Sequence, residues 1–595
     1  MSTETAQNLK ILPAHESFSL EAIIEAKMRN STLAPSKKDE RLIDRLDRTY
    51  TQVGRLYFDH RLANPISDIQ IIQARQEVTQ EFINSSLAHI LEPLFQELKE
   101  SEEHILGFFA KRPVEIDSRF LALKFTAGGK ELNKRVNQYS AIVSLSAAIK
   151  TTESGLSALL KAATVVAMPL YALSLTGLLE ESANEVLNEA LEEFANRTAI
   201  TSGVTLGLMQ AIGGPTLRAG AAITAAGVTV SSVPATFGYF SANLNVEAYV
   251  QNKLVVVARY FRAMEKIYTL LTSIEAISSR LEHFEKLKSF FQNPDLQYLF
   301  SLLRSRTFNA KASYLFLRGP VVLVWEYFTR EFVITEFEKA FLAIGEIDTF
   351  LSVTRLMAES DIEGNCPYCF PKYVENKSGE KPFISVIGLH NPLVPFVPEC
   401  SEDLIKLGLH SSQNLLLTAP NTSGKSTKIR ALAYLAALQG LGIAPAKEVS
   451  GSLFDLVISS KGLMDSSQQS LHQSYLNFSN QLLAKLEQSP DKNVLVLLDE
   501  AFTTTESKDG ASFLKGLLDL LQEKKNAVVL VASHFKELID NVEGYVHYTI
   551  EPSSRKLICG SFKGSNAFQL AEQMEVGHDL LDRARQFRAT MEMQS

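Results

Sequence analysis

Lysine and hydroxyl side chains at positions 425–427 follow a loop of small residues, and this grouping could bind a phosphate. The stretch NLLLTAPNTSGKST, Asn414 to Thr427, opens with an apolar run short enough for a buried strand. The loop leads into a helix-like run from Ile429 to Gln439. This order of strand, loop, Lys-Ser and helix is typical of a phosphate-binding P-loop. Backbone N–H groups and the dipole at the start of such a helix attract an anion.

Each residue type in this loop has an expected role. Lys425 would reach the β- and γ-phosphates of a nucleotide, and the Ser426 hydroxyl would hold Mg²⁺. Ala419 stands where the pattern has its first glycine, and its methyl group is expected to restrict the turn. A chance Gly-Lys-Ser at a helix start is the alternative. The candidate nucleotide-binding residues are Ala419, Pro420, Asn421, Thr422, Ser423, Gly424, Lys425, Ser426 and Thr427.

Two further apolar runs end in polar residues that could complete such a site. The run Val494 to Leu498 leads into Asp499 and Glu500, which matches a Walker B strand with two acids at its carboxyl end. Asp499 would bind Mg²⁺ through water, and Glu500 would position or deprotonate the attacking water. A third run ends before His534, which could hydrogen-bond the γ-phosphate or that water. Solvated acids and a surface histidine are the plainer alternatives.

Composition narrows the class of protein. A chain of 595 residues is too long for one core, and its 46% hydrophobic and 21% charged content is ordinary for folded domains. The net charge of −8 gives no global attraction to nucleic acid. Four cysteines favour a reducing compartment over a disulfide framework, and the N-terminus does not resemble a secretory signal. These features predict a cytoplasmic location, with membrane association as the alternative.

The chain divides by pattern into six segments. Apolar residues at helical spacing predict helices over 1–154 and again over 247–360. Residues 361–380 read as a linker, which contains a lone Cys366-x-x-Cys369 taken as ordinary residues rather than a metal or redox site. From 381 to 563 strands and helices alternate, which predicts a parallel α/β sheet with Phe383 to Ile387 as one of its strands. Residues 564–595 read as C-terminal helices.

Residues 155–246 form an apolar insertion. No charged residue falls between Lys161 and Glu180, and two further uncharged stretches rich in Gly, Ala, Thr and Ser follow. The first stretch is near the minimum for a bilayer span, about 17–20 residues. Small residues permit close helix packing either in a membrane or in a tight helical bundle. A membrane hairpin and a buried or oligomer-forming helical insertion therefore both remain open.

The P-loop, the Walker B run and the motifs around them resemble the MutS family of ATPases, within the ABC-type P-loop class. The family's loop reads GPNxxGKST, and this chain has APNTSGKST at 419–427. Gly388–Leu393 is similar to the family's G-x-H-P-L with one inserted Asn, Ala444–Ala446 to its (V/A)-P-A, and Leu497–Phe513 to its LDE-x-G-x-G-T-x-x-x-(D/E)-G. Ala532–Phe535 is similar to its A-T-H-Y, and Glu346–Asp348 with Leu351-Ser352 to its E-L-D…S. The resemblance covers about 343–590.

The resemblance implies further site residues and a dimer. Phe396-Val-Pro-Glu399 is similar to the family's F-V-P-N, whose aromatic packs on adenine, so Phe396 is the candidate adenine-stacking residue. In the family, a signature segment of one subunit completes the other's site, and Ser470 to Leu482 corresponds to it here. The family's serine falls on Leu476 and its threonine on Asn477, so Asn477 is the candidate contact to the partner's nucleotide, with Ser474 as a substitute.

Some family features differ. Thr503 and Thr504 replace residues of the flexible G-x-G after the Walker B acids. No segment resembles the mismatch-reading or nuclease-like domains, and Phe95-Gln-Glu97 reads as a core aromatic and a surface acid within a helix.

The expected fold class is therefore α + α/β: a long-helix lever region with an apolar helical insertion, followed by an ABC-type P-loop α/β ATPase domain. The expected function is an ATP- and Mg²⁺-dependent DNA-binding protein of the MutS type, a DNA repair or recombination clamp or damage sensor. It would work as a nucleotide-driven homodimeric switch on duplex or branched DNA. A membrane-associated switch that makes its contact through 155–246, and an ATP-binding dimer with little turnover, are the alternatives.

Overall fold

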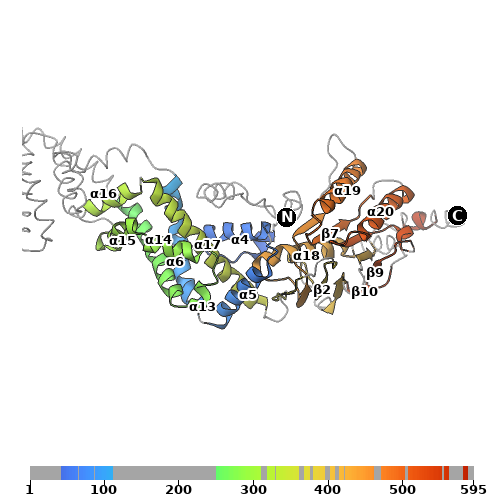
Figure 1. The fold of residues 1–595 in the computed structure, drawn as a ribbon, viewed down its shortest axis with the longest axis horizontal. Coiled ribbons are helices and arrows are strands. Elements are labelled where there is room, and N and C mark those ends of the chain that lie inside the picture. Colours follow the sequence, from blue (N-terminus) through green and yellow to red (C-terminus); the bar gives the residue numbers. More distant parts are fainter. Residues whose placement is uncertain are drawn as a thin grey trace, which may run out of the picture.

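A computed structural model shows an elongated molecule with a helical part at one end and an α/β part at the other (Figure 1). It describes residues 42–64, 66–85, 87–110, 250–309, 318–328, 330–360, 367–375, 380–395, 402–408, 414–420, 423–460, 471–502, 507–539, 541–551, 555–561 and 581–586. The apolar insertion 155–246 lies outside these residues, so both hypotheses about it stay predictions. Among the described helices, none is long and apolar enough to cross a membrane.

The helical part is built around one long helix. This part has an unlabelled helix over 250–272, and otherwise comprises α3 (Leu42–Leu46), α4 (Gln52–Ala63), α5 (Ile69–Asn84), α6 (Leu87–Ala110), α13 (Glu275–Ser278), α14 (Phe284–Gln292), η1 (Pro294–Leu296), α15 (Gln297–Arg304), η2 (Arg306–Phe308), α16 (Arg318–Tyr327) and α17 (Glu331–Ser360). Helix α17 packs against α4, α5 and α14, and it runs toward the α/β part (Figure 1). Its 30 residues include the Glu346–Asp348 and Leu351-Ser352 motif.

The core of the helical part confirms the prediction for Phe95. Phe95 of α6 is buried in this core, and so is Trp325 of α16. Glu97 keeps about a third of its side chain exposed and lies 3.8 Å from Lys266 Nζ. The Phe-Gln-Glu sequence is therefore part of an ordinary amphipathic helix.

Two buried carboxylates of α17 fix the start of neighbouring helices. Asp348 accepts hydrogen bonds from the backbone N–H groups of Tyr50 (3.0 Å) and Thr51 (2.8 Å) and from the Thr51 hydroxyl (2.6 Å), directly before α4. Glu346 accepts from the N–H groups of Glu282 (3.0 Å) and His283 (2.8 Å), directly before α14. Burial raises the pKa of both carboxyls to about 7. A carboxylate at a helix N-terminus satisfies donors that the helix leaves unpaired.

The Asp348 carboxylate is tightly packed against neighbouring helices. A Cβ atom on Gly54 would overlap the Asp348 carboxylate, so glycine is required there for close helix contact. Glu102 of α6 holds the same end of α4 from the other side, because it accepts from the N–H groups of Gln52 (2.6 Å) and Val53 (2.9 Å). Three helices therefore meet at the start of α4.

The α/β part contains two sheets among the described residues. Its elements are β1 (Lys372–Tyr373), β2 (Ile384–Ile387), β3 (Leu404–Leu407), β4 (Asn414–Thr418), α18 (Lys425–Leu438), η4 (Gln439–Leu441), β5 (Glu448–Gly451), β6 (Leu456–Ser459), α19 (Leu471–Glu487), β7 (Val494–Asp499), α20 (Ser507–Gln522), β8 (Ala527–Ser533), η5 (Lys536–Leu538), β9 (Tyr545–Ile550) and β10 (Leu557–Cys559). A six-stranded sheet has the order β10-β9-β4-β8-β7-β6. All its neighbours pair in parallel except β10 and β9.

Helices cover both faces of this sheet. Alternate residues of β4, β7 and β8 pack with α18 on one face and with α19 and α20 on the other. Strands β4, β7 and β8 are buried at every position, which explains their continuous apolar sequences. The predicted α/β architecture is confirmed for this sheet.

One predicted strand belongs elsewhere. We expected Phe383 to Ile387 in the parallel sheet, but β2 lies in a separate four-stranded sheet of order β1-β5-β2-β3 and pairs antiparallel with both β3 and β5. The expected linker 361–380 also contributes strand β1 to this sheet, and Cys369 pairs with Ala444 through two backbone hydrogen bonds of 3.1 and 2.9 Å. The pairings with β5 and of Cys369 with Ala444 join residues about 60–80 positions apart, which local patterns do not reveal.

The helical part touches the α/β part at the end of α18. Arg75 of α5 donates to the carbonyl of Gly440 in η4, and its guanidinium also contacts Glu282 at 2.8 Å. Gln76 donates to the carbonyls of Pro371 (2.9 Å) and Gly442 (3.1 Å). Side chains of α3, α4 and α17 share a hydrophobic core with α18. The two parts therefore meet through packed side chains and hydrogen bonds.

We expect substitution of Asp348 by alanine to destabilise the fold by about 3 kcal/mol, because three buried donors before α4 would lose their acceptor. The matched control is Glu359→Ala on the same helix. Glu359 forms a half-exposed ion pair with Arg48 at 2.8 Å, so its loss should cost less than about 1 kcal/mol. Urea denaturation measures both values. Equal shifts for the two variants would contradict the capping role of Asp348.

Candidate functional site

The predicted site residues gather at the carboxyl ends of three neighbouring parallel strands. Thr418 at the end of β4 is level with Ser533 of β8, and Asp499 at the end of β7 is level with Ala532 of β8. Helix α18 begins at Lys425, after Gly424 in a left-handed conformation with φ of 106°. A Cβ at Gly424 would meet no other described atom within 4 Å, so its side of the loop is open. Ligands bind at such strand ends in open α/β sheets.

Lys425 is the central cation of this site. Its ammonium group donates to the carbonyl oxygens of Ala419 (2.6 Å) and Pro420 (3.2 Å) and lies 3.6 Å from Glu500 Oε1. The side chain is 4% exposed, and burial lowers the pKa of Lys425 while the charge of Glu500 partly opposes that shift. A charged group held inside a loop of backbone amides is suited to an anionic ligand.

Ser426 and Asp499 form a second contact across the site. The Ser426 hydroxyl lies 3.1 Å from Asp499 Oδ1. Asp499 is buried, and its backbone N–H donates to the Ser460 hydroxyl at 2.9 Å. Ser460 follows strand β6 and was not singled out from the sequence, because its contact joins residues 39 positions apart. Hydroxyl and carboxylate oxygens are the ligand types that Mg²⁺ prefers.

The loop fits a nucleotide phosphate with its metal ion. The Ser423 hydroxyl is buried and has no hydrogen-bond partner among the described residues, which a ligand oxygen could satisfy. Lys425 would contact the phosphates, and Ser426 with Asp499 would hold Mg²⁺. Asn421 and Thr422 lie outside the described residues, so their roles stay predictions.

The expected restriction at Ala419 is not found. The described non-glycine residues with positive φ are Glu500, Phe502 and Arg555, so the turn at Ala419 does not need the left-handed conformation that favours glycine. Ala419 is buried and offers its carbonyl to Lys425. Alanine is therefore compatible with the loop geometry.

Glu500 is held in an unusual backbone conformation. Its φ is 51°, and its backbone N–H donates to the carbonyl of Ala532 at 3.0 Å. The side chain is 42% exposed and faces Lys425. Two residues on, Phe502 has φ of 63° and is almost fully buried. Left-handed conformations cost roughly 1–2 kcal/mol for residues other than glycine. Phe502 falls on the first glycine of the LDE-x-G-x-G-T pattern, a departure that we did not single out from the sequence.

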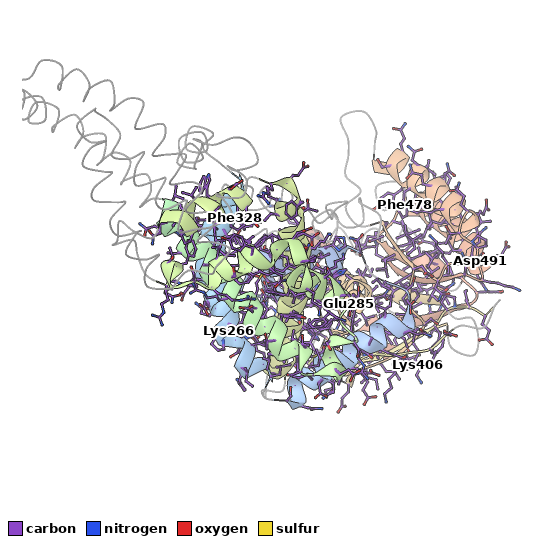
Figure 2. All side chains as sticks on the ribbon, turned by 60° about the vertical axis from the view of Figure 1, so that its left-hand side comes forward. Lys266, Glu285, Phe328, Lys406, Phe478 and Asp491 are labelled. Atoms are coloured by element: carbon purple, nitrogen blue, oxygen red, sulfur yellow. The ribbon has the colours of Figure 1, made fainter. Side chains whose placement is uncertain are left out.

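The remaining predicted residues are placed less centrally. His534 directly follows β8 and is exposed, with its ring centroid 4.8 Å from that of Phe535. Asn477 is exposed on α19, whereas Leu476 and Phe478 pack against the sheet's core. In Figure 2, Phe478 lies on the side of the molecule away from Phe328 of the helical part. Phe396 lies outside the described residues. The roles of His534, Asn477 and Phe396 stay predictions.

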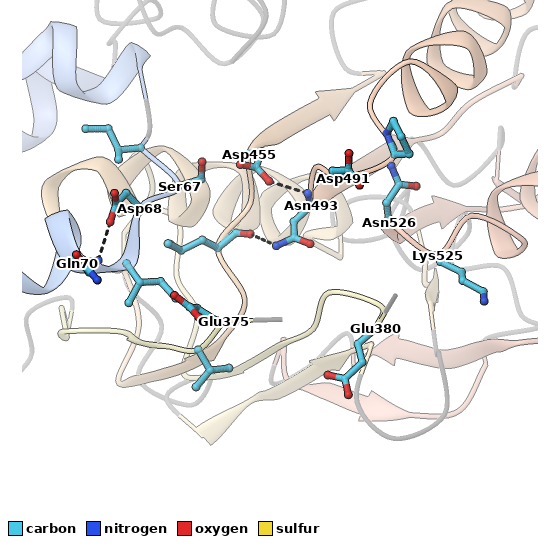
Figure 3. A pocket seen from close by; sticks show the side chains of 15 residues that line it. Ser67, Asp68, Gln70, Glu375, Glu380, Asp455, Asp491, Asn493, Lys525 and Asn526 are labelled. Atoms are coloured by element: carbon cyan, nitrogen blue, oxygen red, sulfur yellow. Dashed lines mark hydrogen bonds between the residues drawn. The ribbon is translucent and has the colours of Figure 1, made fainter. Parts of the chain in front are cut away.

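A cavity of about 800 Å³ lies away from this site (Figure 3). It is bordered by the start of α5, the end of β1 and the loops before β7 and β8, which is the opposite edge of the parallel sheet. Two of its carboxylates already hold backbone groups. Asp68 accepts from the N–H of Gln70 (2.8 Å), and Asp455 accepts from that of Asn493 (2.7 Å). Asp68 and Asp455 therefore have structural roles, and we place the candidate functional site at the carboxyl ends of the parallel strands.

Fold and side-chain arrangement define the class of this part of the chain: an α/β domain in which a lysine and a hydroxyl from the start of a helix meet two acids at the carboxyl end of a parallel strand. More particularly, this domain is similar to the ATPase domain of the MutS family. Residues 415–588 match the family model described as MutS domain V.

Curated relatives agree with the family match. The Endonuclease MutS2 of Fusobacterium nucleatum is 28% identical over 262 residues, which cover 41% of this chain and 32% of that protein. The Putative endonuclease MutS2 of Bacillus subtilis is 29% identical over 227 residues, 36% of this chain and 28% of that protein. The DNA mismatch repair protein MutS of Alkaliphilus metalliredigens is 26% identical over 278 residues, 44% of this chain and 30% of that protein. The chain thus spans about a third or less of the length of these relatives.

Proposed function

We propose that this protein binds and hydrolyses ATP at the carboxyl edge of its parallel sheet, and that it works as a homodimeric switch on duplex or branched DNA. The observation that carries the proposal is the convergence of Lys425, Ser426, Asp499 and Glu500 from two adjoining elements, α18 and the end of β7. The match of residues 415–588 to the family model described as MutS domain V supports the same activity.

In this proposal, each site residue has a separate role in ATP hydrolysis. Lys425 and the first N–H groups of α18 bind and orient the phosphates. A bound Mg²⁺ supplies positive charge that stabilises the transferring phosphoryl group. Glu500 accepts a proton from a water molecule as that water's oxygen attacks the γ-phosphorus, and the bond between the γ-phosphorus and the bridging oxygen breaks to release ADP. Glu500 is suited to this role because its side chain is partly exposed beside Lys425.

In a dimer, nucleotide binding would change how the two subunits are arranged. In our proposal, α19 presents Asn477 to the nucleotide of the second subunit, so that ATP favours a closed pair. Closure would reach the helical part through α18, whose end contacts Arg75. A ligand shifts such an equilibrium by as much as it prefers the closed state.

We expect Lys425→Ala to weaken ATP binding by roughly tenfold to a hundredfold, which corresponds to the loss of hydrogen bonds to a charged group, about 1.5–3 kcal/mol. Calorimetric titration with ATP and Mg²⁺ measures the effect. The matched control is Lys406→Ala, an exposed lysine of β3 whose loss should leave ATP binding unchanged. Unchanged affinity in Lys425→Ala would contradict a phosphate site at this loop.

Replacement of Glu500 by alanine should lower the rate of phosphate release by about 10²–10⁴-fold, the usual contribution of a general base, while ATP affinity stays within about threefold. Single-turnover assays and equilibrium binding separate the two quantities. If phosphate release from the native protein is no faster than from Glu500→Ala, the protein is an ATP-binding dimer with little turnover.

We expect the full-length protein to bind duplex or branched DNA with an affinity that falls steeply with salt, because phosphate contacts release counterions. Fluorescence anisotropy at about 50 and 200 mM salt, with and without ATP, measures this dependence. No binding to a duplex, a junction or a mismatch at the lower salt concentration would rule out the DNA part of the proposal and leave the ATP part intact.

A further inference from the structure

A buried aromatic side chain follows the acids of the candidate site. Phe502 is 1% exposed and has φ of 63°, two residues after Glu500 with φ of 51°. A bulky residue rarely adopts this conformation, and it persists where the surroundings over-determine it. The contacts of the Phe502 ring therefore matter for the path of the chain at Glu500.

Two helices hold the Phe502 ring. Its centroid lies 5.5 Å from that of Tyr475 on α19, and 6.0 Å from that of Phe513 on α20, with which it stacks at 17°. Tyr475 is 7% exposed, whereas Phe513 is 47% exposed. Aromatic pairs at these separations attract beyond their simple burial. The ring is thus fixed by side chains from outside its own loop.

Glu500 is consequently anchored on both sides. Its own N–H is bonded to the carbonyl of Ala532 in β8, and the chain two residues on is fixed by Phe502. The Tyr475 hydroxyl lies near enough to the acids that the charges of Asp499 and Glu500 add to burial in raising the pKa of Tyr475. The aromatic contact and the acids therefore occupy the same small region.

We propose that Phe502 is a positioning residue for Glu500: its ring, held between Tyr475 and Phe513, sets the Glu500 carboxylate opposite Lys425. The proposal rests on the ATP hydrolysis proposed above. In this proposal both faces of helix α19 have a role, because Tyr475 points into the core while Asn477 is exposed. A shift of α19 would alter the contact on Phe502 and thereby the placement of Glu500.

The test compares variants of the full-length protein. Phe513→Ala removes a half-exposed contact of the Phe502 ring and should leave the fold intact, whereas Leu520→Ala removes an equally exposed side chain, 47%, two turns further along α20. Misplaced catalytic groups lose large factors in rate, so Phe513→Ala and Phe502→Ala should lower kcat for ATP hydrolysis, the latter by at least about tenfold. ATP affinity should change by less than about twofold, and Leu520→Ala should match the native protein.

Two further measurements separate positioning from general stability. Tyr475→Phe keeps the ring and should retain kcat, whereas Tyr475→Ala should lose it. Amide hydrogen exchange in the peptide around 499–502 should rise in Phe502→Ala and Phe513→Ala but not in Leu520→Ala, because the loop loses its anchor.

The outcomes are distinguishable. An unchanged kcat and unchanged exchange in Phe513→Ala and Tyr475→Ala would overturn the positioning role, as would a loss of kcat matched by an equal loss of ATP affinity. A native protein that binds ATP without hydrolysing it would refute the proposed hydrolysis, and hydrogen exchange would still decide whether Phe502 fixes the loop.

Discussion

The burial of two carboxylates on α17 is the constraint on which the helical part depends. Removing a carboxylate from water is costly, by several kcal/mol, unless hydrogen bonds replace the lost solvation. Asp348 and Glu346 obtain them from the backbone directly before α4 and α14. Either acid without its helix start would lose its backbone hydrogen bonds inside the core, so each acid stabilises the packing of α17 against the helix that it caps. Arg61 adds a cation to this cluster, 3.4 Å from Glu346 and 2.9 Å from Glu282.

The cluster of Glu346, Arg61 and Glu282 is connected to the candidate nucleotide site through α18. Glu282 also contacts Arg75, which donates to the Gly440 carbonyl just past the end of α18. At its other end α18 begins with Lys425. Fourteen residues of α-helix span about 21 Å. In the proposed switch, a displacement of α18 as one body would move the loop before Lys425 and the contact with Arg75 together.

Local sequence patterns predicted the parallel sheet well, because its strands are covered on both faces and therefore apolar throughout. The run Val494 to Leu498 is an example, and its following acids stand at the sheet edge as expected. Local sequence patterns did not predict contacts between residues far apart in the chain. Strand β2 alternates in burial like any half-covered strand, and nothing local indicates that its partners are β3 and β5. The capping roles of Glu102 and Ser460 likewise join residues 39–50 positions apart.

Two of the described residues, Ala419 and Phe502, stand where the family's motifs have glycine, and their backbone conformations differ. Ala419 needs no left-handed conformation, so a methyl group is accommodated there and the loop keeps its carbonyl contact with Lys425. Phe502 does adopt that conformation, and its side chain must offset the strain. The ring does so by packing between Tyr475 and Phe513. A glycine would leave the loop free to change its path at no steric cost, whereas an aromatic side chain makes the path of the loop depend on where α19 and α20 lie. Phenylalanine at 502 thus replaces the flexibility that glycine would give after Asp499 and Glu500 with a contact to α19, the helix that carries Asn477.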